Sequence, residues 1–211
     1  MRLAVRALLS AGLAVGWAAV PAAAHQAGPR VRAIDPAVAA APWLPVIKPA
    51  PEFALLDTAG RPVRLSELRG RVVLVAFVYT RCTAACPLLT ARMARLQATL
   101  GADVERVRLL SITVDPARDS ADALAEYARR FAADGRRWRF LREEPAALAP
   151  VLAAYDEWTR PVAGGEIEHP ARLHLIDAAG RIREIYSLAF FDERQALIDI
   201  RALLKEGYSE R

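Results

Sequence analysis

The sequence is poor in the residues that build most metal sites and disulfide frameworks. Its 211 residues include only two cysteines, three histidines and two methionines. Two cysteines exclude a disulfide-rich scaffold and a four-cysteine zinc site, because both need more sulfur atoms than the chain has. They allow one disulfide bridge, one redox couple, or two ligands of a single metal ion. Because Cys82 and Cys86 lie close together in the sequence, the central question is what this pair does.

The chain also lacks a long run of positive charge. Its formal net charge of +5 arises from 29 lysine and arginine residues against 24 aspartate and glutamate residues. The arginines are scattered among acids without interleaved aromatic residues, which is typical of a solvated surface rather than of a nucleic-acid interface. We therefore expect no nucleic-acid partner. With 54% hydrophobic residues, the composition excludes a disordered or collagen-like chain and suits one domain with an extension.

Residues 1–24 carry the features of a secretory signal peptide. Two arginines begin the segment, residues 7–20 are almost wholly apolar, and small residues ending at Ala24 offer a cleavage site. The alternative is an uncleaved membrane anchor, although the apolar stretch is shorter than the ~20 residues that span a bilayer. In either case we expect an exported, periplasmic domain, soluble or tethered to the inner membrane. After cleavage His25 begins the chain, as a copper-chelating amine and imidazole or as a solvated end.

The remaining chain divides into a tether and one domain. Residues 25–50 contain repeated prolines, which interrupt any periodic pattern and predict an extended tether. From 51 to 211, strand and helix signals alternate, which predicts an α/β domain with a mixed central sheet flanked by helices. It begins with a β-hairpin near 53–65. The other elements expected are strands at about 71–79, 107–114, 138–141, 172–177 and 181–187, and helices at about 84–101, 119–133, 145–155 and 192–205.

The cysteine pair directly follows the most apolar of the predicted strands. Reactive groups in open α/β sheets gather at the carboxyl ends of strands, and a helix N-terminus stabilises a thiolate. A spacing of four places the sulfur atoms of Cys82 and Cys86 on one helix face. Pro87 is tolerated because the first helical turn has no internal acceptor for its missing N–H. Two such sulfur atoms suit Cu(I) or a short-loop disulfide, whereas two inert buried cysteines are disfavoured in an exported protein.

A third metal ligand would come from one of the three histidines. His174 lies inside an apolar strand, where a histidine packed within the sheet is the favoured interpretation. His169 precedes that strand, in a loop that can bring an imidazole to the two sulfur atoms. His25 is the remaining candidate. Sequence spacing alone leaves this choice open.

The domain from Phe53 onward resembles the Sco/SenC family of thioredoxin-like copper proteins. The matching segments, in the family's order, are FALLDTAGRPVRLSELRGRVVLVAFVYTRCTAACP, SITVDPARDS and EHPARLHLIDAAGRI. Three residues between the cysteines separate this pattern from thioredoxins, which have two, and peroxiredoxins carry a different motif. The resemblance implies a thioredoxin-like fold. It also implies that Cys82, Cys86 and His169 bind copper, as Cu(I) or Cu(II).

The sequence departs from the family pattern beside this histidine. The family usually has aspartate before it, whereas this chain has Glu168, so the role of that acid stays open. Pro170 follows and favours extended backbone at the histidine. Asp115 and Asp119 match a family segment near the site, although turn and helix-cap chemistry is the favoured interpretation of both.

Two functional hypotheses follow from the motif. The resemblance implies a metallochaperone that delivers copper to the binuclear copper site of cytochrome c oxidase during assembly, with a copper-accepting oxidase subunit as its partner. The alternative is a periplasmic thiol–disulfide oxidoreductase, in which Cys82 and Cys86 form the redox couple that reduces a copper-site partner and a thioredoxin-like reductant regenerates them. Whether the chain is an enzyme depends on which role it has. We expect a monomer in both cases.

Overall fold

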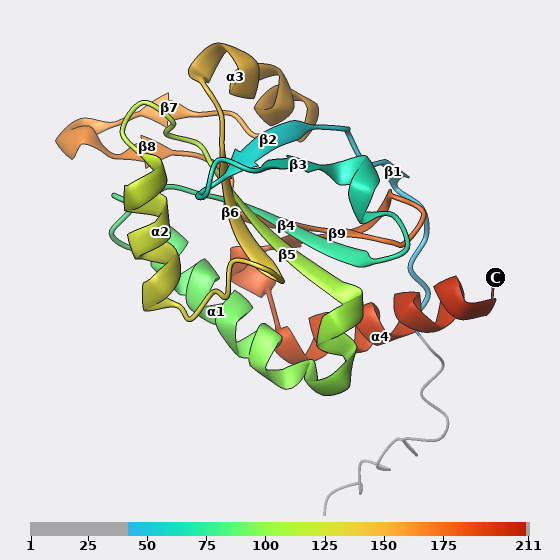
Figure 1. Cartoon of the computed structure of the whole chain (residues 1–211). Coiled ribbons are helices and arrows are strands. Elements are labelled where there is room, and N and C mark those ends of the chain that lie inside the picture. Colours follow the sequence, from blue (N-terminus) through green and yellow to red (C-terminus); the bar gives the residue numbers. More distant parts are fainter. Residues whose placement is uncertain (1–41, 210–211) are drawn as a thin grey trace, which may run out of the picture. The chain divides into compact units, whose positions relative to one another are not determined.

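The computed structural model describes residues 42–209, with side chains as far as residue 207 (Figure 1). The predicted signal segment 1–24, His25 and most of the predicted tether lie outside the described residues. Within the described part of the chain, no helix is both long enough and apolar enough to cross a membrane.

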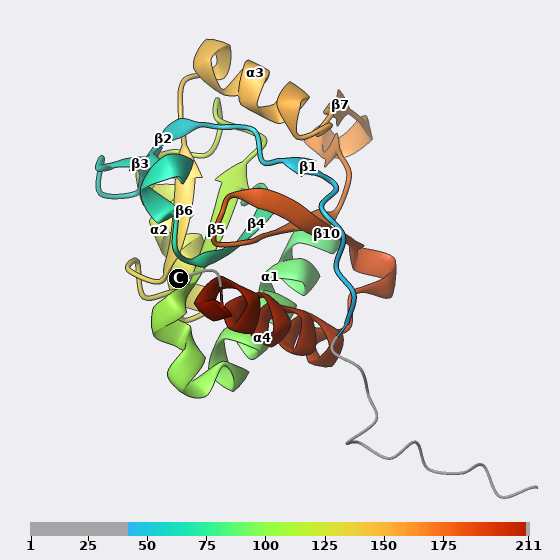
Figure 2. The same ribbon diagram turned by 90° about the vertical axis from the view of Figure 1, so that its right-hand side faces the viewer.

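An eight-stranded mixed sheet forms the centre of the domain (Figures 1 and 2). Its spatial order is β1-β10-β9-β4-β5-β6-β2-β3. The strands are β1 (Lys48–Pro49), β2 (Ala54–Asp57), β3 (Pro62–Arg64), β4 (Val72–Val78), β5 (Val107–Thr113), β6 (Trp138–Arg142), β9 (Arg172–Ile176) and β10 (Arg181–Ser187). The central strands β4, β5 and β6 pair in parallel, and the outer strands add antiparallel pairs, as the sequence predicts. Every residue of β4 is buried, which explains its unbroken apolar sequence.

Helices cover both faces of this sheet. The α-helices are α1 (Ala85–Thr99), α2 (Ala121–Arg130), α3 (Pro145–Ala154) and α4 (Glu193–Ser209). Short 3₁₀ helices are η1 (Leu65–Leu68), η2 (Gly101–Arg106), η3 (Ala163–Gly165) and η4 (Leu188–Phe190). The helices α1, α2 and α4 lie on one face and α3 on the other (Figures 1 and 2). Right-handed crossovers from β4 to β5 and from β5 to β6 place α1 and α2 on the same face.

The main sheet includes residues that the sequence predicts to be part of the tether. Strand β1 lies inside the segment 25–50, yet it pairs with β10, where the Ile47 N–H donates to Ile182 and the Ala50 N–H to Gly180. Pro49 has no N–H to donate, but an edge strand does not need one on its outer side. Leu44 is buried as well. The last residues of the predicted tether are therefore part of the folded domain.

A second, two-stranded sheet occupies a stretch for which the sequence predicts a loop. It pairs β7 (Arg160–Pro161) with β8 (Ile167–Glu168). Gly164 and Gly165 have φ angles of 78° and 76°, and glycine adopts this left-handed backbone without steric cost. The turn between the strands therefore depends on these two glycines. The hairpin matters because His169 follows directly after β8.

His174 is enclosed within the main sheet, which agrees with its interpretation as a sheet histidine. It lies on β9 between β4 and β10 and is 1% exposed. The rings of Phe77 and Tyr155 stand edge-on to it, with centroids 5.9 and 5.2 Å away. Burial, with help from the nearby positive charges of Arg172 and Lys48, lowers the pKa of His174 to about 4.

We expect the stability of the domain to fall as the pH drops from about 6.5 to about 4. In the unfolded chain a histidine takes up a proton near pH 6.5, whereas folded His174 stays neutral until about pH 4. The unfolded state therefore binds more protons in this window, and the free energy of unfolding decreases by up to ~1.4 kcal/mol per pH unit. Urea unfolding of the wild type and of His174→Leu at several pH values measures this slope.

The variant should have a flatter pH dependence than the wild type. Ile185→Val is the matched control, because Ile185 lies opposite His174 in the register of β10 but does not titrate. It should lower stability by a similar amount at every pH. Equal slopes in the wild type and in His174→Leu would contradict the assignment.

Candidate metal centre

Cys82 and Cys86 lie where β4 ends and α1 begins. A short turn follows Val78, and α1 starts at Ala85, so Cys86 lies in the first helical turn. Cys86 is 2% exposed, whereas Cys82 is partly exposed, and both are free thiols. The backbone N–H of Cys86 donates to the Cys82 sulfur at 3.2 Å. The helix N-terminus therefore meets the sulfur of Cys82, as the strand-to-helix pattern predicts.

The two thiols are electrostatically unequal. A hydrogen bond from the Cys86 thiol, together with backbone N–H groups of Cys86 and Ala84, lowers the pKa of Cys82 to about 5 against the effect of burial. The same hydrogen bond favours the protonated form of Cys86, and burial adds to it, so the pKa of Cys86 is raised. At neutral pH, Cys82 is therefore the thiolate and Cys86 the thiol that donates to it.

His169 approaches the cysteines from the end of β8. The hydroxyl of Tyr79 accepts a hydrogen bond from the Ile167 N–H at 3.1 Å, which ties β8 to the end of β4. The His169 ring stands edge-on to the ring of Tyr79, with centroids 5.9 Å apart. Its Nε2 atom is 3.6 Å from the Cys86 sulfur. The structure thus brings His169 into contact with a cysteine that lies 83 positions earlier in the sequence.

Behind His169 lies a buried carboxylate that no sequence pattern indicates. The side chain of Glu157 has no exposed area, and its Oε2 atom is 3.6 Å from Nδ1 of His169. Its other oxygen, Oε1, is 3.7 Å from Nε of Arg172. Burial raises the pKa of Glu157, and the contact with His169 opposes that rise. Glu157 belongs to no recognisable motif, and a single acid after a helix gives no sign that it will be buried.

Glu168, the acid beside His169 in the sequence, points away from the imidazole. It pairs across the small hairpin with Arg160, whose Nε lies 2.9 Å from its Oε2. Successive residues of a strand face opposite sides, so an acid directly before His169 is directed away from that ring. The role that the sequence left open for Glu168 is therefore a cross-strand ion pair.

Asp119 and Asp115 hold the loops around the cysteines. The buried carboxylate of Asp119 accepts from the Thr80 N–H, from the Thr80 hydroxyl at 2.6 Å and from the Thr113 hydroxyl at 2.6 Å. Asp115 pairs with Arg118, which donates to the Gly165 carbonyl at 2.5 Å. Both acids thus have structural roles, as the turn interpretation predicts, although the side chain that caps α2 is Ser120.

A depression of about 290 Å³ opens over Cys82 and His169. Tyr79, Val162 and Glu166 are among its other lining residues. The hydroxyl of Thr83 donates to Glu166 at 2.6 Å, so the cysteine loop and the hairpin are joined at its rim. Cys82 is therefore partly open to solvent, whereas the side chains of His169 and Cys86 are almost fully covered.

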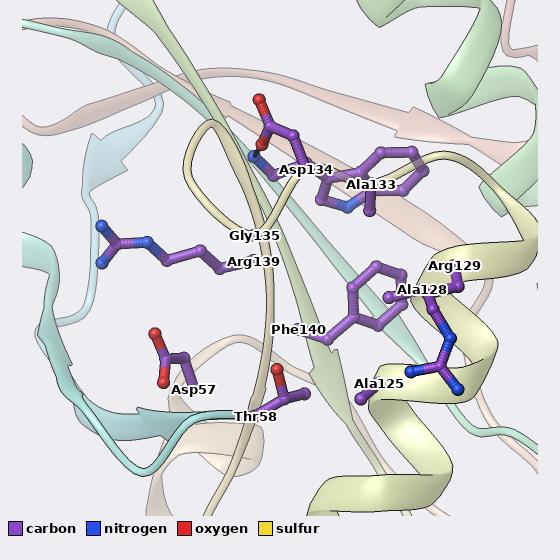
Figure 3. A pocket seen from close by; sticks show the side chains of 11 residues that line it. Asp57, Thr58, Ala125, Ala128, Arg129, Ala133, Asp134, Gly135, Arg139 and Phe140 are labelled. Carbon is purple, nitrogen blue, oxygen red and sulfur yellow. Dashed lines mark hydrogen bonds between the residues drawn. The ribbon is translucent and has the colours of Figure 1, made fainter.

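Another cavity, of about 200 Å³, lies between the β2–β3 turn, α2 and β6 (Figure 3). The carboxylates of its two acidic residues already accept hydrogen bonds. Asp57 accepts from the N–H groups of Ala59 and Arg61 in its own turn, and Asp134 accepts from three N–H groups that lead into β6. Their carboxylates serve the local backbone rather than a ligand.

The residues of the cysteine site suit a soft metal ion in their chemistry. In the described part of the chain, no three histidine, cysteine or acidic side chains stand close enough together to hold a metal as they are. Cys86 contacts Cys82 on one side and His169 on the other, so the three side chains would have to draw closer together to hold a metal. Two sulfur atoms and an imidazole form a donor set that copper prefers.

A family model described as SCO1/SenC matches residues 47–205. The chain belongs to the SCO1/SenC family. This confirms the resemblance inferred from the cysteine motif. The SCO1 protein homolog of Bacillus subtilis is 29% identical to this SCO1/SenC protein over 141 residues, which cover 64% of this chain and 72% of the homolog.

Solved Sco structures share the fold of this SCO1/SenC protein. ScoI of Bradyrhizobium japonicum, solved with copper bound, is 27% identical and superposes with a TM-score of 0.65, covering 74% of this chain and 99% of ScoI. BsSco, described as a member of the Sco family of cytochrome c oxidase assembly proteins with a disulfide switch, is 23% identical with a TM-score of 0.66, covering 75% of this chain and 95% of BsSco. These similarities confirm the predicted thioredoxin-like fold.

We expect an alkylating reagent to modify Cys82 before Cys86. A thiolate is the reactive form of cysteine, and the pKa of Cys82 is about 5, whereas Cys86 is protonated and buried. Limiting iodoacetamide at neutral pH, followed by peptide mass spectrometry of the reduced metal-free protein, should place the label on Cys82 by at least ~10-fold.

The alkylation rate of Cys82 should rise with pH through an inflection near pH 5. In Cys86→Ala the inflection should move upward, because the thiol that donates to the Cys82 sulfur is gone. Equal labelling of both cysteines, or a wild-type inflection near the ordinary cysteine value of ~8.5, would refute the assignment.

Proposed function

We propose that this SCO1/SenC protein is an exported copper metallochaperone. It binds copper through Cys82, Cys86 and His169 and delivers it to the binuclear copper site of cytochrome c oxidase during assembly. The observation that carries the proposal is the 3.6 Å approach of the His169 Nε2 atom to the Cys86 sulfur. The copper bound to Bradyrhizobium ScoI, and the membership of BsSco in the Sco family of cytochrome c oxidase assembly proteins, support it.

The inequality of the two thiols suggests how copper enters and leaves. Cys82 is a partly exposed thiolate that lines the depression, so it meets the incoming ion first. Cys86 is covered and protonated, and it must release its proton to become a ligand, as metal binding requires of a thiol. His169 completes the set from the opposite loop. Copper is thus held by a buried and a partly exposed sulfur atom.

Copper leaves this site as cargo, by ligand exchange. A sulfur ligand of the accepting oxidase subunit takes the place of the exposed Cys82 sulfur, and the remaining ligands follow in turn. Each bond to copper that breaks is replaced by one that forms, so Cu(I) is handed over without a change in its oxidation state. The predicted signal segment 1–24 supports a periplasmic location, soluble or tethered to the inner membrane.

We expect the reduced protein to bind one equivalent of Cu(I) under anaerobic conditions. Titration against a competing chelator gives the affinity of the wild type and of Cys82→Ser, Cys86→Ser and His169→Ala. Each substitution removes a ligand and should weaken binding by more than the ~10- to 100-fold typical of losing an outer-shell partner. His25→Ala is the control, and it should bind copper as the wild type does. Tight copper binding in both cysteine variants would contradict the proposal.

A thiol–disulfide oxidoreductase is the second candidate, favoured by the lowered pKa of Cys82 beside Cys86. The Cys82 thiolate would attack a partner's disulfide, forming a mixed disulfide and releasing one partner thiolate. Cys86, after losing its proton, would attack the Cys82 sulfur and release the second partner thiolate. Two electrons thus pass to the partner and the chain keeps a Cys82–Cys86 disulfide, which a thioredoxin-like reductant would reduce.

Replacement of His169 should separate the two functions. His169→Ala should lose tight copper binding yet still reduce a synthetic peptide closed by one disulfide, because disulfide exchange needs only the two sulfur atoms. Cys82→Ser should lose both. Peptide reduction is followed by mass spectrometry with the reduced wild type in parallel. No reduction by the wild type would exclude the second candidate and leave the copper proposal standing.

A further inference from the structure

Glu157 occupies a backbone position that normally carries an apolar side chain. Helix α3 ends in a Schellman motif, in which the Asp156 N–H bonds to Ala153 and the Glu157 N–H to Leu152. Asp156 has a φ of 57°, the left-handed conformation that reverses the chain there. The residue after this reversal commonly packs an apolar side chain back against the last turn of the helix. Here the reversal buries a carboxylate instead.

The carboxylate of Glu157 lies between His169 and Arg172. The side chain of Glu157 is 0% exposed and that of His169 is 4% exposed. One Glu157 oxygen is 3.6 Å from Nδ1 of His169, and the other is 3.7 Å from Nε of Arg172. These atoms, all buried, have no hydrogen-bond partner within the described part of the chain. The second imidazole nitrogen, Nε2, faces the Cys86 sulfur.

This order of groups has a chemical consequence for the imidazole. A neutral histidine carries one ring proton, and the nitrogen without it is the one that binds a metal. A carboxylate beside Nδ1 favours the proton on that nitrogen, which leaves the lone pair on Nε2. Arg172 balances the charge of the carboxylate from the other side. Other acids are not placed to do this, since Glu168 pairs with Arg160.

We propose that Glu157 is a positioning residue that fixes the tautomer and the orientation of His169. It holds the proton on Nδ1 and directs Nε2 toward the sulfur atoms, so that the imidazole is ready to bind copper. The metal-binding part of this inference rests on the proposed function. The tautomer is a property of the metal-free protein and is tested separately. An alternative is that Glu157 only pairs with Arg172, in which case its loss leaves the imidazole unchanged.

The first experiment measures the imidazole without metal. Long-range ¹⁵N NMR of the histidine rings in the reduced full chain reports which nitrogen carries the proton. The wild type should have His169 mainly protonated at Nδ1. In Glu157→Leu, and to a lesser degree in the isosteric Glu157→Gln, the population protonated at Nε2 should rise. Glu168→Gln is the matched control, and it should leave the His169 signals unchanged.

The second experiment measures Cu(I) affinity by chelator competition at one fixed pH. Both Glu157 variants should bind Cu(I) roughly 10- to 100-fold more weakly than the wild type, whereas Glu168→Gln should stay within about twofold. His169→Ala combined with Glu157→Gln should bind no more weakly than His169→Ala alone, because the acid acts through the imidazole.

The outcomes separate this inference from the proposed function. A His169 tautomer that is the same in the wild type and both Glu157 variants overturns the inference, as do additive losses of affinity in the double variant. If Glu157→Leu does not fold, Glu157→Gln gives the same readings. If wild-type copper binding does not depend on His169, the proposed function fails, while the tautomer shift still decides whether Glu157 positions the ring.

Discussion

The buried carboxylate of Asp119 fixes the place where β4 ends, and the cysteine site depends on that contact. Three donors from Thr80 and Thr113 converge on it. Burial raises the pKa of Asp119, and these hydrogen bonds counter that rise by stabilising the charged form. Because Thr80 follows β4 and Thr113 ends β5, the carboxylate joins the carboxyl ends of two parallel strands. The chain therefore leaves the sheet at a fixed point before it reaches the first cysteine.

The parts of the fold that the sequence predicts are those determined by local patterns. The unbroken apolar run of β4, rich in β-branched residues, favours a strand buried on both faces, and helix signals follow it at once. The structure differs where pairing partners are distant. Strand β1 and the hairpin of β7 and β8 contain two residues per strand. Strands this short have no detectable alternating pattern. They form because they pair with strands elsewhere in the chain.

The candidate site is likewise predictable from the sequence only where its residues lie in a local motif. The strand-to-helix junction and the cysteine spacing indicate Cys82 and Cys86, and family resemblance adds His169. Neither identifies Glu157, because only the fold places the end of α3 beside the end of β8. Sequence adjacency even suggests the wrong acid. Glu168 is the neighbour of His169 along the chain, but strand alternation directs it to the opposite side.

The two thiols remain unequal because of where each lies. Cys82 sits before the helix, where backbone N–H groups and the Cys86 thiol point at its sulfur. Cys86 lies one turn further on, inside the core, where a charge is costly. Both proposed functions use this difference, since a partly exposed thiolate starts either metal capture or disulfide exchange and a covered thiol follows it. The fold thus determines which sulfur atom reacts first. It does not by itself decide between copper binding and disulfide exchange.

Glu157 helps to decide between copper binding and disulfide exchange. A buried carboxylate that lacks full hydrogen bonding costs stability, and an apolar residue at the same helix terminus would pack there without that cost. Disulfide exchange between Cys82 and Cys86 does not require an imidazole ligand held in one orientation. A metal site does, because a metal-binding imidazole needs its other nitrogen held. The position of the Glu157 carboxylate therefore favours copper binding over disulfide exchange as the function of the site.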